Sequence, residues 1–359
     1  MNKFTVAFCV AVCPALAVAQ GAIQYQRGDD NQAELQQLGG IGNISQQYQD
    51  GTGNLSQITQ TGDYNNAHVR QRSSFSEAQV TQYGHYNQLR IYQGASNWPF
   101  EGRSGSDWTA EVVQLGNANQ VALQQDQGYG SVAYLHQEGN RNVHQVRQTG
   151  YPNSLETRSI GDDNRVTVNQ RDGFATSRVA QLGNANQVSI DQWLFPYDGT
   201  VEVVQQGIAN RADVIQRGSR RSVGDVVLKQ DGSNNLMAVQ QRDGHDRFQF
   251  TQAGSDNELD AWQAGVLLKV SGSSIGDGNR VAILQLYHFA DLRVTQIGDD
   301  NLIDVSQNDL GWYQESASIE QIGNANQAML SQATADFIDT SQVATIVQHG
   351  DGNVASVSQ

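Results

Sequence analysis

The chain has 359 residues and a formal net charge of −15 at pH 7, which argues against nucleic acid and anionic membrane surfaces as primary partners. It contains 47 glutamines and 27 asparagines. Amides that recur at fixed positions between apolar residues are typical of stacked ladders in a cross-β arrangement.

The first 19 residues are typical of a secretory signal peptide. Lys3 forms a basic start, residues 4–16 form an apolar stretch, and residues 17–19 read Ala-Val-Ala, a small-residue cleavage site. Both cysteines, Cys9 and Cys13, lie in this segment, so the mature chain is expected to contain no disulfide. Lipid modification of Cys13 is an alternative, although its neighbours are a poor context for it. No later stretch is long enough to span a membrane.

From Gln26 to Gln359 the chain repeats one pattern, Q-x-G-x-x-N-x-φ-x-φ-x-Q with φ apolar, at spacings close to multiples of 11. The residues two and four positions after each motif asparagine are apolar, as in Val121 and Leu123 after Asn119. The residues between them are mostly polar, and this period of two predicts strands with one buried face. The motif asparagine and glutamine share the phase of the apolar pair, so we expect them to point inward.

The segment Q-x-G-x-x-N is expected to be the corner that joins two strands, with glycine supplying the backbone freedom that the bend needs. A rung is then strand, corner, strand and corner in about 22 residues. We therefore predict an all-β fold in which residues 20–359 form a single elongated β-solenoid of about 14 rungs, with Gln/Asn ladders inside. At roughly 4.8 Å per rung the rod is about 70 Å long.

The corners fall on two edges, which we call the regular edge and the variable edge. On the regular edge, thirteen of fourteen corners keep [QS]-x-G-x-x-N, and only the corner at Gln37 has an extra residue. On the variable edge only the corners at Gln26, Gln49 and Gln148 keep the motif. The insertions are all assigned to this edge. Its loops are expected to carry the three prolines of the mature chain and several aromatic residues, namely Pro99, Pro152, Pro196, Trp98, Phe100, Trp193, Phe195, Trp312 and Tyr313.

The residues expected to form the ladders and corners are the glutamine, glycine and asparagine of each motif and three glutamines of the variable edge. They are Gln60, Gly62, Asn65, Gln82, Gly84, Asn87, Gln114, Gly116, Asn119, Gln125, Gln137, Gly139, Asn142, Gln181, Gly183, Asn186, Gln192, Gln205, Gly207, Asn210, Gln230, Gly232, Asn235, Gln252, Gly254, Asn257, Gln296, Gly298, Asn301, Gln307, Gln321, Gly323, Asn326, Gln348, Gly350 and Asn353.

Catalytic and metal-binding patterns are weak in this chain. The seven histidines are scattered without metal-ligand spacing, and His144, at an inward position, is expected to be a packed side chain. We therefore predict that the protein is not an enzyme and has no cofactor. Calcium binding by acidic corners such as Asp162 and Asp299 is an alternative to their ordinary role in turns. A β-helix enzyme acting on polysaccharide would need a cluster of Asp, Arg or Lys at one level of the rod.

The two ends of the repeat are expected to be uncapped. The first motif begins at Gln26 and the last stops at Gln359, which leaves no room for the polar caps that keep solenoids monomeric. We expect rungs of different molecules to stack and to extend the ladders into a fibre.

Motif copies such as QLGNANQVALQQ, QIGDDNLIDVSQ and QIGNANQAMLSQ resemble the curlin repeat of bacterial curli, the extracellular functional amyloids of biofilms. The resemblance covers essentially the whole mature chain. It implies a curlin nucleator and an outer-membrane curlin secretion channel as partners, assembly on the cell surface, and roles in adhesion and biofilm matrix. The stacking role is carried over to residues such as Gln114, Gly116, Asn119 and Gln125.

The chain departs from the curlin pattern in three ways. It has roughly three times as many repeats as a typical curlin, it nearly lacks the glycine-rich targeting segment, and its variable edge carries aromatic loops. The last feature supports an alternative function, a monomeric surface adhesin whose loops, including those of Trp98, Trp193 and Trp312, stack on the sugar rings of glycans.

Overall fold

The computed structural model describes residues 20–94, 105–194, 198–218, 224–242, 244, 246–309, 314–334 and 341–359. These residues form β-strands and turns without any helix, so none of them lies in a helix long and apolar enough to cross a membrane. The predicted signal peptide, with Cys9 and Cys13, lies outside the described residues. The chain divides into two compact units, Met1–Asp172 and Gly173–Gln359, and each is described by itself.

The first unit is a β-solenoid of two parallel sheets, and its rungs contain one strand from each sheet. One sheet contains the odd-numbered strands β1 (Gly21–Arg27), β3 (Ile44–Asp50), β5 (Asn66–Arg72), β7 (Gln88–Gly94), β9 (Gln120–Gly128), β11 (Val143–Gly150) and β13 (Arg165–Arg171). The other sheet contains the even-numbered strands β2 (Gln32–Leu38), β4 (Leu55–Thr61), β6 (Glu77–Tyr83), β8 (Thr109–Leu115), β10 (Val132–Glu138) and β12 (Ser154–Ile160).

The second unit repeats this arrangement. Its odd-numbered strands are β15 (Gln187–Leu194), β17 (Arg211–Gly218), β19 (Leu236–Arg242), β21 (Glu258–Val266), β23 (Arg280–His288), β25 (Leu302–Asp309), β27 (Gln327–Thr334) and β29 (Val354–Ser358). Its even-numbered strands are β14 (Phe174–Asn184), β16 (Asp198–Ile208), β18 (Asp225–Ser233), β20 (Arg247–Ser255), β22 (Lys269–Ile275), β24 (Ala290–Ile297), β26 (Glu315–Ile322) and β28 (Val343–His349).

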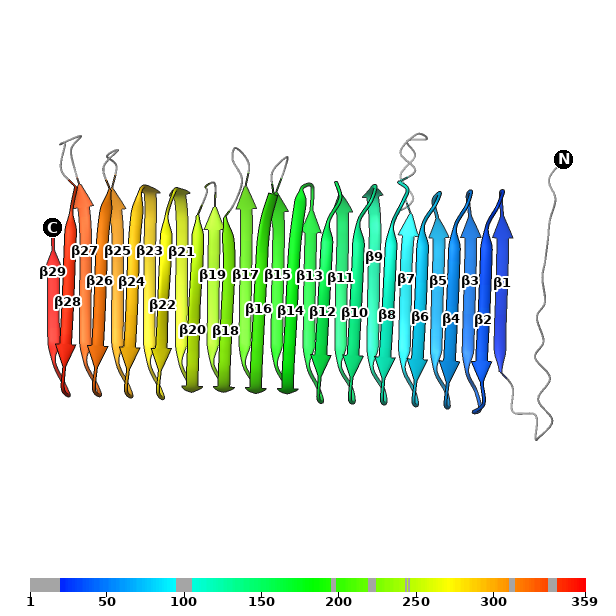
Figure 1. The fold of residues 1–359 in the computed structure, drawn as a ribbon, viewed down its shortest axis with the longest axis horizontal. Helices are drawn as coiled ribbons and strands as arrows, with labels where there is room; N and C mark the ends of the chain where they lie inside the picture. The colour runs from blue at the N-terminus through cyan, green and yellow to red at the C-terminus, as the bar shows by residue number, and fades with distance from the viewer. Residues whose placement is uncertain are drawn as a thin grey trace. The chain divides into compact units, whose positions relative to one another are not determined.

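Within each unit the odd-numbered strands point in one direction and the even-numbered strands in the other (Figure 1). Every strand pairs in parallel with its neighbours in the same sheet, and equivalent motif positions are register partners. Gln82 of β6 is opposite Gln114 of β8, although 32 residues separate them. The predicted all-β solenoid is therefore confirmed as the fold class.

The strand bounds also confirm the two predicted edges. Connections from an even strand to the next odd strand contain two to five residues throughout. Within the units, connections from an odd strand to the next even strand vary from one residue, after β23, to fourteen residues, after β7. Apart from the one extra residue in the corner after β2, the solenoid therefore places its extra residues on the variable edge, where they do not disturb strand register.

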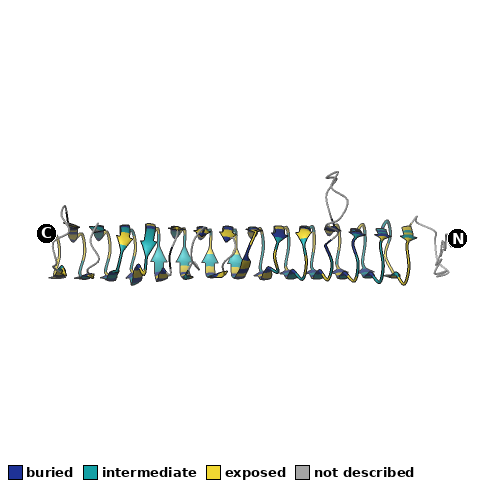
Figure 2. Cartoon of the chain, turned by 90° about the horizontal axis from the view of Figure 1, so that it is seen from above, coloured by how far each residue is buried: buried dark blue, intermediate teal, exposed yellow. Residues whose placement is uncertain are grey.

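The core lies between the two layers of strands, which face each other across each rung (Figure 2). In β16, Val201 and Val203 are fully buried, whereas Glu202 and Val204, which each follow one of them, are only half-buried. This alternation is the pleat of a strand with one covered face.

We expect a matched pair of substitutions in β16 to separate the two faces of the strand. Val203→Asp places an unpaired charge in the core and should lower the free energy of unfolding by about 3 kcal/mol or more. Val204→Asp, one residue along on the outward face, should change it by less than about 0.5 kcal/mol. Guanidinium denaturation followed by circular dichroism measures both, and similar losses for the two variants would contradict the assigned phase.

Candidate functional site: glycine corners and amide columns

Each corner of the regular edge after the one at Gln37 contains two residues with positive φ. The motif glycine is the first, as in Gly116 with φ 108°. The residue just before the motif asparagine is the second, as in Ala118 with φ 56° and Arg141 with φ 56°. Sequence reasoning missed this second position because Tyr, Ala, Arg, Asp, Asn and Gly all occupy it, so no single residue type marks it.

The motif glycines stack on one another and leave no space for a side chain. A Cβ on Gly116 would lie 2.1 Å from the carbonyl oxygen of Gly139 in the next rung, and a Cβ on Gly62 would lie 2.1 Å from that of Gly84. Both glycines also have a φ that L side chains rarely adopt. Glycine is therefore required at this position for two reasons. Its φ is one that other residues rarely adopt, and a Cβ would overlap the backbone of the next rung.

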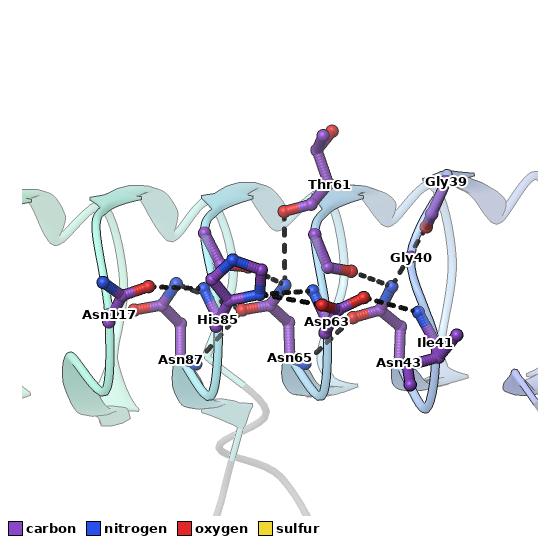
Figure 3. Close-up of polar contacts among 12 residues, drawn as sticks. Gly39, Gly40, Ile41, Asn43, Thr61, Asp63, Asn65, His85, Asn87 and Asn117 are labelled. Atoms are coloured by element: carbon purple, nitrogen blue, oxygen red, sulfur yellow. Dashed lines mark hydrogen bonds and ion pairs between the residues drawn. The ribbon is translucent and has the colours of Figure 1, made fainter.

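The motif asparagines form a continuous column within each unit, and Figure 3 shows Asn43, Asn65 and Asn87 of the first unit. The backbone N–H and Nδ2 of Asn87 both donate to Oδ1 of Asn65, each over 3.1 Å. Nδ2 of Asn87 also donates to the carbonyl oxygen of Gly116 in the following rung, over 2.8 Å. One buried side chain therefore connects three rungs and satisfies backbone groups that the bend would otherwise leave unpaired.

An outer column covers the same corners on the solvent side (Figure 3). Asp63 Oδ1 accepts from the backbone N–H of Ile41 over 2.8 Å, and Asn117 Oδ1 accepts from that of His85 over 3.0 Å. The acidic corners have the same role, since Asp299 Oδ1 accepts from the N–H of Asp277 over 2.9 Å. Across the described ranges, no group of three or more His, Cys, Asp and Glu side chains could hold a metal ion.

The motif glutamines of the regular edge form a second buried column. Nε2 of Gln60 donates to Oε1 of Gln82, and Nε2 of Gln82 donates to Oε1 of Gln114, each over 2.8 Å. All the predicted glutamines of the site are buried, all the predicted glycines have positive φ, and all the predicted asparagines except the half-buried Asn353 are buried.

The variable edge has its own glutamine column, which is unbroken within each unit. Nε2 of Gln71 donates to Oε1 of Gln93 over 2.9 Å, and Gln93 donates to Gln125 over 2.9 Å. Its members are Gln26, Gln49, Gln71, Gln93, Gln125, Gln148 and Gln170 in the first unit and Gln192, Gln216, Gln241, Gln263, Gln285, Gln307, Gln332 and Gln359 in the second. Only Gln125, Gln192 and Gln307 were in the predicted set. The others, except Gln26, are the final glutamine of the motif, six residues after an inward asparagine, and this position was expected to point inward.

Serine replaces glutamine at two positions of the regular-edge column, and each gap is filled differently. At Ser159 the space is taken by His144, which is fully buried and lies 2.8 Å by Nε2 from Ser159 Oγ and 3.0 Å by Nδ1 from Thr157 Oγ1. Burial, with a smaller effect from His136, lowers the pKa of His144 to about 3. The predicted packed histidine is therefore neutral and completes the polar core locally.

The second gap, at Ser274, leaves a defect. Nε2 of the buried Gln252 has no hydrogen-bond partner among the described residues, because Ser274 is too short to accept from it. In the same pair of strands Phe250 occupies the space above Gly272, where a Cβ would lie 2.5 Å from the phenyl ring. The neighbouring register partners of this pair, Leu228 and Val294, are apolar, so the ring and the glycine change the apolar packing beside the gap.

The variable edge closes its corners with different side chains. Asn54, Ser76, Trp108, Ser131 and Asn153 are all buried directly before an even strand of the first unit. Trp108, which is 1% exposed, was not singled out in the sequence, because nothing marks it as inward except its phase with Ala110.

The predicted aromatic loops are only partly described. Trp193 was expected in a loop, but this is wrong, because it lies in β15 and is 52% exposed on the outward face. Its phase within the strand, one residue after the buried Gln192, explains this position. Pro152 lies between β11 and β12 as expected. The remaining predicted loop residues, Trp98, Pro99, Phe100, Phe195, Pro196, Trp312 and Tyr313, lie outside the described residues.

A shallow groove of about 410 Å³ crosses the outer face of the odd sheet in the first unit. Its lining includes Gln46, His68, Arg90, Gln120 and Gln145 but neither aspartate nor glutamate. Most glycoside hydrolases use a pair of carboxylates, which this groove does not offer. The prediction that the protein is not an enzyme stays a prediction.

We expect two glycine substitutions to separate dihedral strain from rung contact. Gly116→Ala and Gly350→Ala share a positive φ, 108° and 100°. A Cβ on Gly350 has no atom nearer than 3.7 Å, whereas one on Gly116 meets the next rung. Gly116→Ala should therefore cost about 3 kcal/mol more than Gly350→Ala in the free energy of unfolding, measured by denaturation of freshly prepared monomer. Equal costs would show that the glycine column does not constrain the rungs.

The burial of His144 should make stability depend on pH. Its pKa of about 3 in the folded state is below the ordinary value of 6.5, so the unfolded chain binds a proton that the folded chain excludes. Stability should therefore fall as pH drops from 6.5 towards 3, by about 2 kcal/mol between pH 6.5 and pH 5. The double variant His144→Val with Ser159→Gln, which copies neighbouring rungs, should lose this part of the pH dependence of the denaturation midpoint. An unchanged slope would contradict the assignment.

Comparison of the chain with models of known protein families and with curated proteins gives no match. The resemblance to the curlin repeat therefore continues to depend on the motif copies themselves.

Proposed function

We propose that this protein is a secreted structural subunit that stacks end to end, rung on rung, into extracellular curli-like amyloid fibres for cell adhesion and biofilm matrix. The observation that supports the proposal most directly is that each ladder repeats the same hydrogen bond from one rung to the next. Buried amides of the columns bond to the same residue type one rung away, as Gln60 does to Gln82 and Asn87 to Asn65, so a rung of another copy offers the same partners as a rung of the same chain.

The hydrogen bonds of the ladders have one direction, which favours head-to-tail stacking. Where a column is complete, each glutamine donates from Nε2 to Oε1 of the glutamine in the rung that follows it. At β1 and β2, Oε1 of Gln26 and of Gln37 accepts no hydrogen bond from the described residues. At β28 and β29, Nε2 of Gln348 and of Gln359 donates only to backbone carbonyls. Donors at one end thus match acceptors at the other.

The terminal rungs also leave core positions partly uncovered. In the described chain, β1, β2, β28 and β29 are each paired on one side only. The inward Ala355 and Val357 of β29 are half-buried, whereas their register partners Ala328 and Leu330 in β27 are 0% and 3% exposed. Unpaired strand edges of this kind are templates for pairing with another chain.

The route to the cell surface is proposed from the sequence. The signal peptide pattern of residues 1–19 supports export, and the resemblance to curlins supports an outer-membrane secretion channel and a nucleator as partners. The fibre itself would then be the functional product, and the protein would act without a cofactor.

Purified mature protein should become thioflavin-positive and give a cross-β reflection near 4.7 Å, the spacing of strands in a sheet. Seeding with preformed fibres should shorten the lag, because the exposed ladders act as templates. A protein that stays a soluble monomer for days at tens of micromolar would contradict the proposal.

Two alanine variants in the last corner test whether growth uses this end. In a stack, a Cβ on Gly350 would meet the carbonyl of the next copy, as a Cβ on Gly323 meets Gly350 at 2.3 Å in the chain itself. Gly350→Ala should therefore fold but elongate at least about tenfold more slowly, because this contact is as close as those that exclude Cβ elsewhere in the column. Gly352→Ala is the matched control, since alanine occupies the same corner position at Ala118 and Ala325. Equal growth of the two variants would count against end-to-end stacking at this rung.

A further inference from the structure

The two outer faces of the first unit carry charges of opposite sign. In the described strands, seven arginines point outward from the odd sheet against one aspartate, Asp50, while Asp126 of β9 is buried. Five glutamates point outward from the even sheet against one arginine, Arg158. Both faces belong to the same rungs, so the unit is positive on one side and negative on the other.

The positive face contains an arginine–tyrosine column, which consists of the register partners Tyr25, Tyr48, Arg70, Tyr92, Gln124 and Arg147. The guanidinium of Arg70 lies 5.8 Å from the ring centre of Tyr92, and the rings of Tyr25 and Tyr48 are 6.2 Å apart. These contacts hold the side chains in a row across the strands. For Arg147 the recorded carboxylate partner is Asp126, at 3.7 Å.

The arginines of this face affect the pKa of a neighbouring histidine. The pKa of His68, which lies beside the column, is held below its ordinary value by burial and by the charges of Arg90 and Arg70. Acidic side chains on the same face therefore do not cancel the local positive potential at these positions.

The negative face contains a glutamate column, which consists of the register partners Glu34, Gln57, Gln79, Glu111, Tyr134 and Glu156. The recorded side-chain partners of the Glu34 carboxylate are amides, Gln36 at 2.9 Å and Gln57 at 3.2 Å. Amides leave the charge of a carboxylate in place, so the column presents negative charge to a partner.

The two columns lie at the same position along the strands, on opposite faces of the rungs. Gln47, the residue before Tyr48, reaches across the core, and its Nε2 donates to the backbone carbonyl of Glu34 over 2.9 Å and to Ser56 Oγ over 2.9 Å. Ser56 in turn precedes Gln57 of the glutamate column. Moving one copy sideways by the thickness of a rung would therefore bring its arginine–tyrosine column onto the glutamate column of the next copy.

We propose that copies of this chain associate side by side through the first unit, with the arginine–tyrosine column of one copy against the glutamate column of a second copy. The two surfaces differ, so the contact is heterologous and can repeat without closing. It gives a way for parallel fibres to bundle, yet it uses only the faces of the first unit and does not require end-to-end growth.

A second copy fits the observations better than an acidic polysaccharide. A polysaccharide would account for the arginine face alone, whereas a second copy accounts for both faces and for the matching position of the two columns along the strands. Ion pairs within one face occur in both units, and in the first unit Arg27 lies 4.0 Å from Asp50. Arg211 lies 2.8 Å from Asp213, and Arg280 lies 3.4 Å from Glu258.

Charge reversal on each face tests the pairing. Arg70→Glu with Arg147→Glu makes both columns negative, and Glu34→Arg with Glu111→Arg makes both columns positive. Each mature full-length variant alone should associate sideways about tenfold less than the parent, since a few exposed pairs supply about that much. An equimolar mixture of the two variants should recover lateral association, because each column then meets a column of opposite sign.

The readouts separate lateral pairing from growth. Fibre width by electron microscopy and sedimentation velocity report side-by-side association, whereas thioflavin kinetics report elongation, which should not change. If the parent never elongates, sedimentation still reports lateral pairing. The control variant Arg247→Glu with Arg293→Glu, exposed on β20 and β24 of the second unit, changes the net charge equally and should bundle like the parent.

Three outcomes would overturn the proposal. The first is bundling of either single-face variant at the level of the parent, and the second is a failure of the mixture to recover. In the third, the arginine-face variant loses binding to an acidic polysaccharide, with alginate as the probe, while its bundling is unchanged. That result would assign the arginine–tyrosine column to a glycan.

Discussion

The fold depends on one interaction, the hydrogen bond between a buried carboxamide and the same carboxamide one rung away. A buried amide without a partner costs about 1–3 kcal/mol, and each rung places several of them between apolar layers. Such side chains are satisfied only if consecutive rungs are in register, because a slip of one residue would turn them to the outer face. Register is therefore fixed by the polar part of the core as much as by its apolar part.

Several other features follow from this constraint. Apart from the extra residue of the corner at Gln37, insertions occur where the chain leaves one sheet and enters the next on the variable edge, as after Gly94, because there they do not shift the columns. Where serine replaces a glutamine of the column, the surrounding core side chains also differ from those of other rungs. His144 fills the gap at Ser159 with a neutral polar ring, and Phe250 with Gly272 repacks the rung near Ser274 at the cost of one unpaired amide on Gln252.

Much of this architecture could be predicted from the sequence, because it depends on a period of two and on residues that repeat at fixed offsets. The strands, the two edges and the inward glutamines and asparagines belong to this class. The left-handed residue before each motif asparagine could not be predicted, since Ala118 and Arg141 share a backbone angle but no chemistry. The inward position of Trp108 and the outward position of Trp193 depend on phase at the variable edge, where the repeat is weakest. The opposite charges of the two faces of the first unit become visible only when alternate residues are assigned to separate sheets.

The same logic connects the fold to assembly. In these ladders each residue bonds to the same residue type in the next rung, so the terminal rungs present the same hydrogen-bonding groups as the interior rungs. The outer faces take no part in the ladders and are free to differ in charge. The most direct test of this account is hydrogen exchange of the side-chain carboxamides, measured by NMR on isotope-labelled protein. The NH2 groups of buried glutamines such as Gln82 and Gln93 should be protected as long as the backbone amides of their strands. Exchange of these groups at the rate of free carboxamides would contradict it.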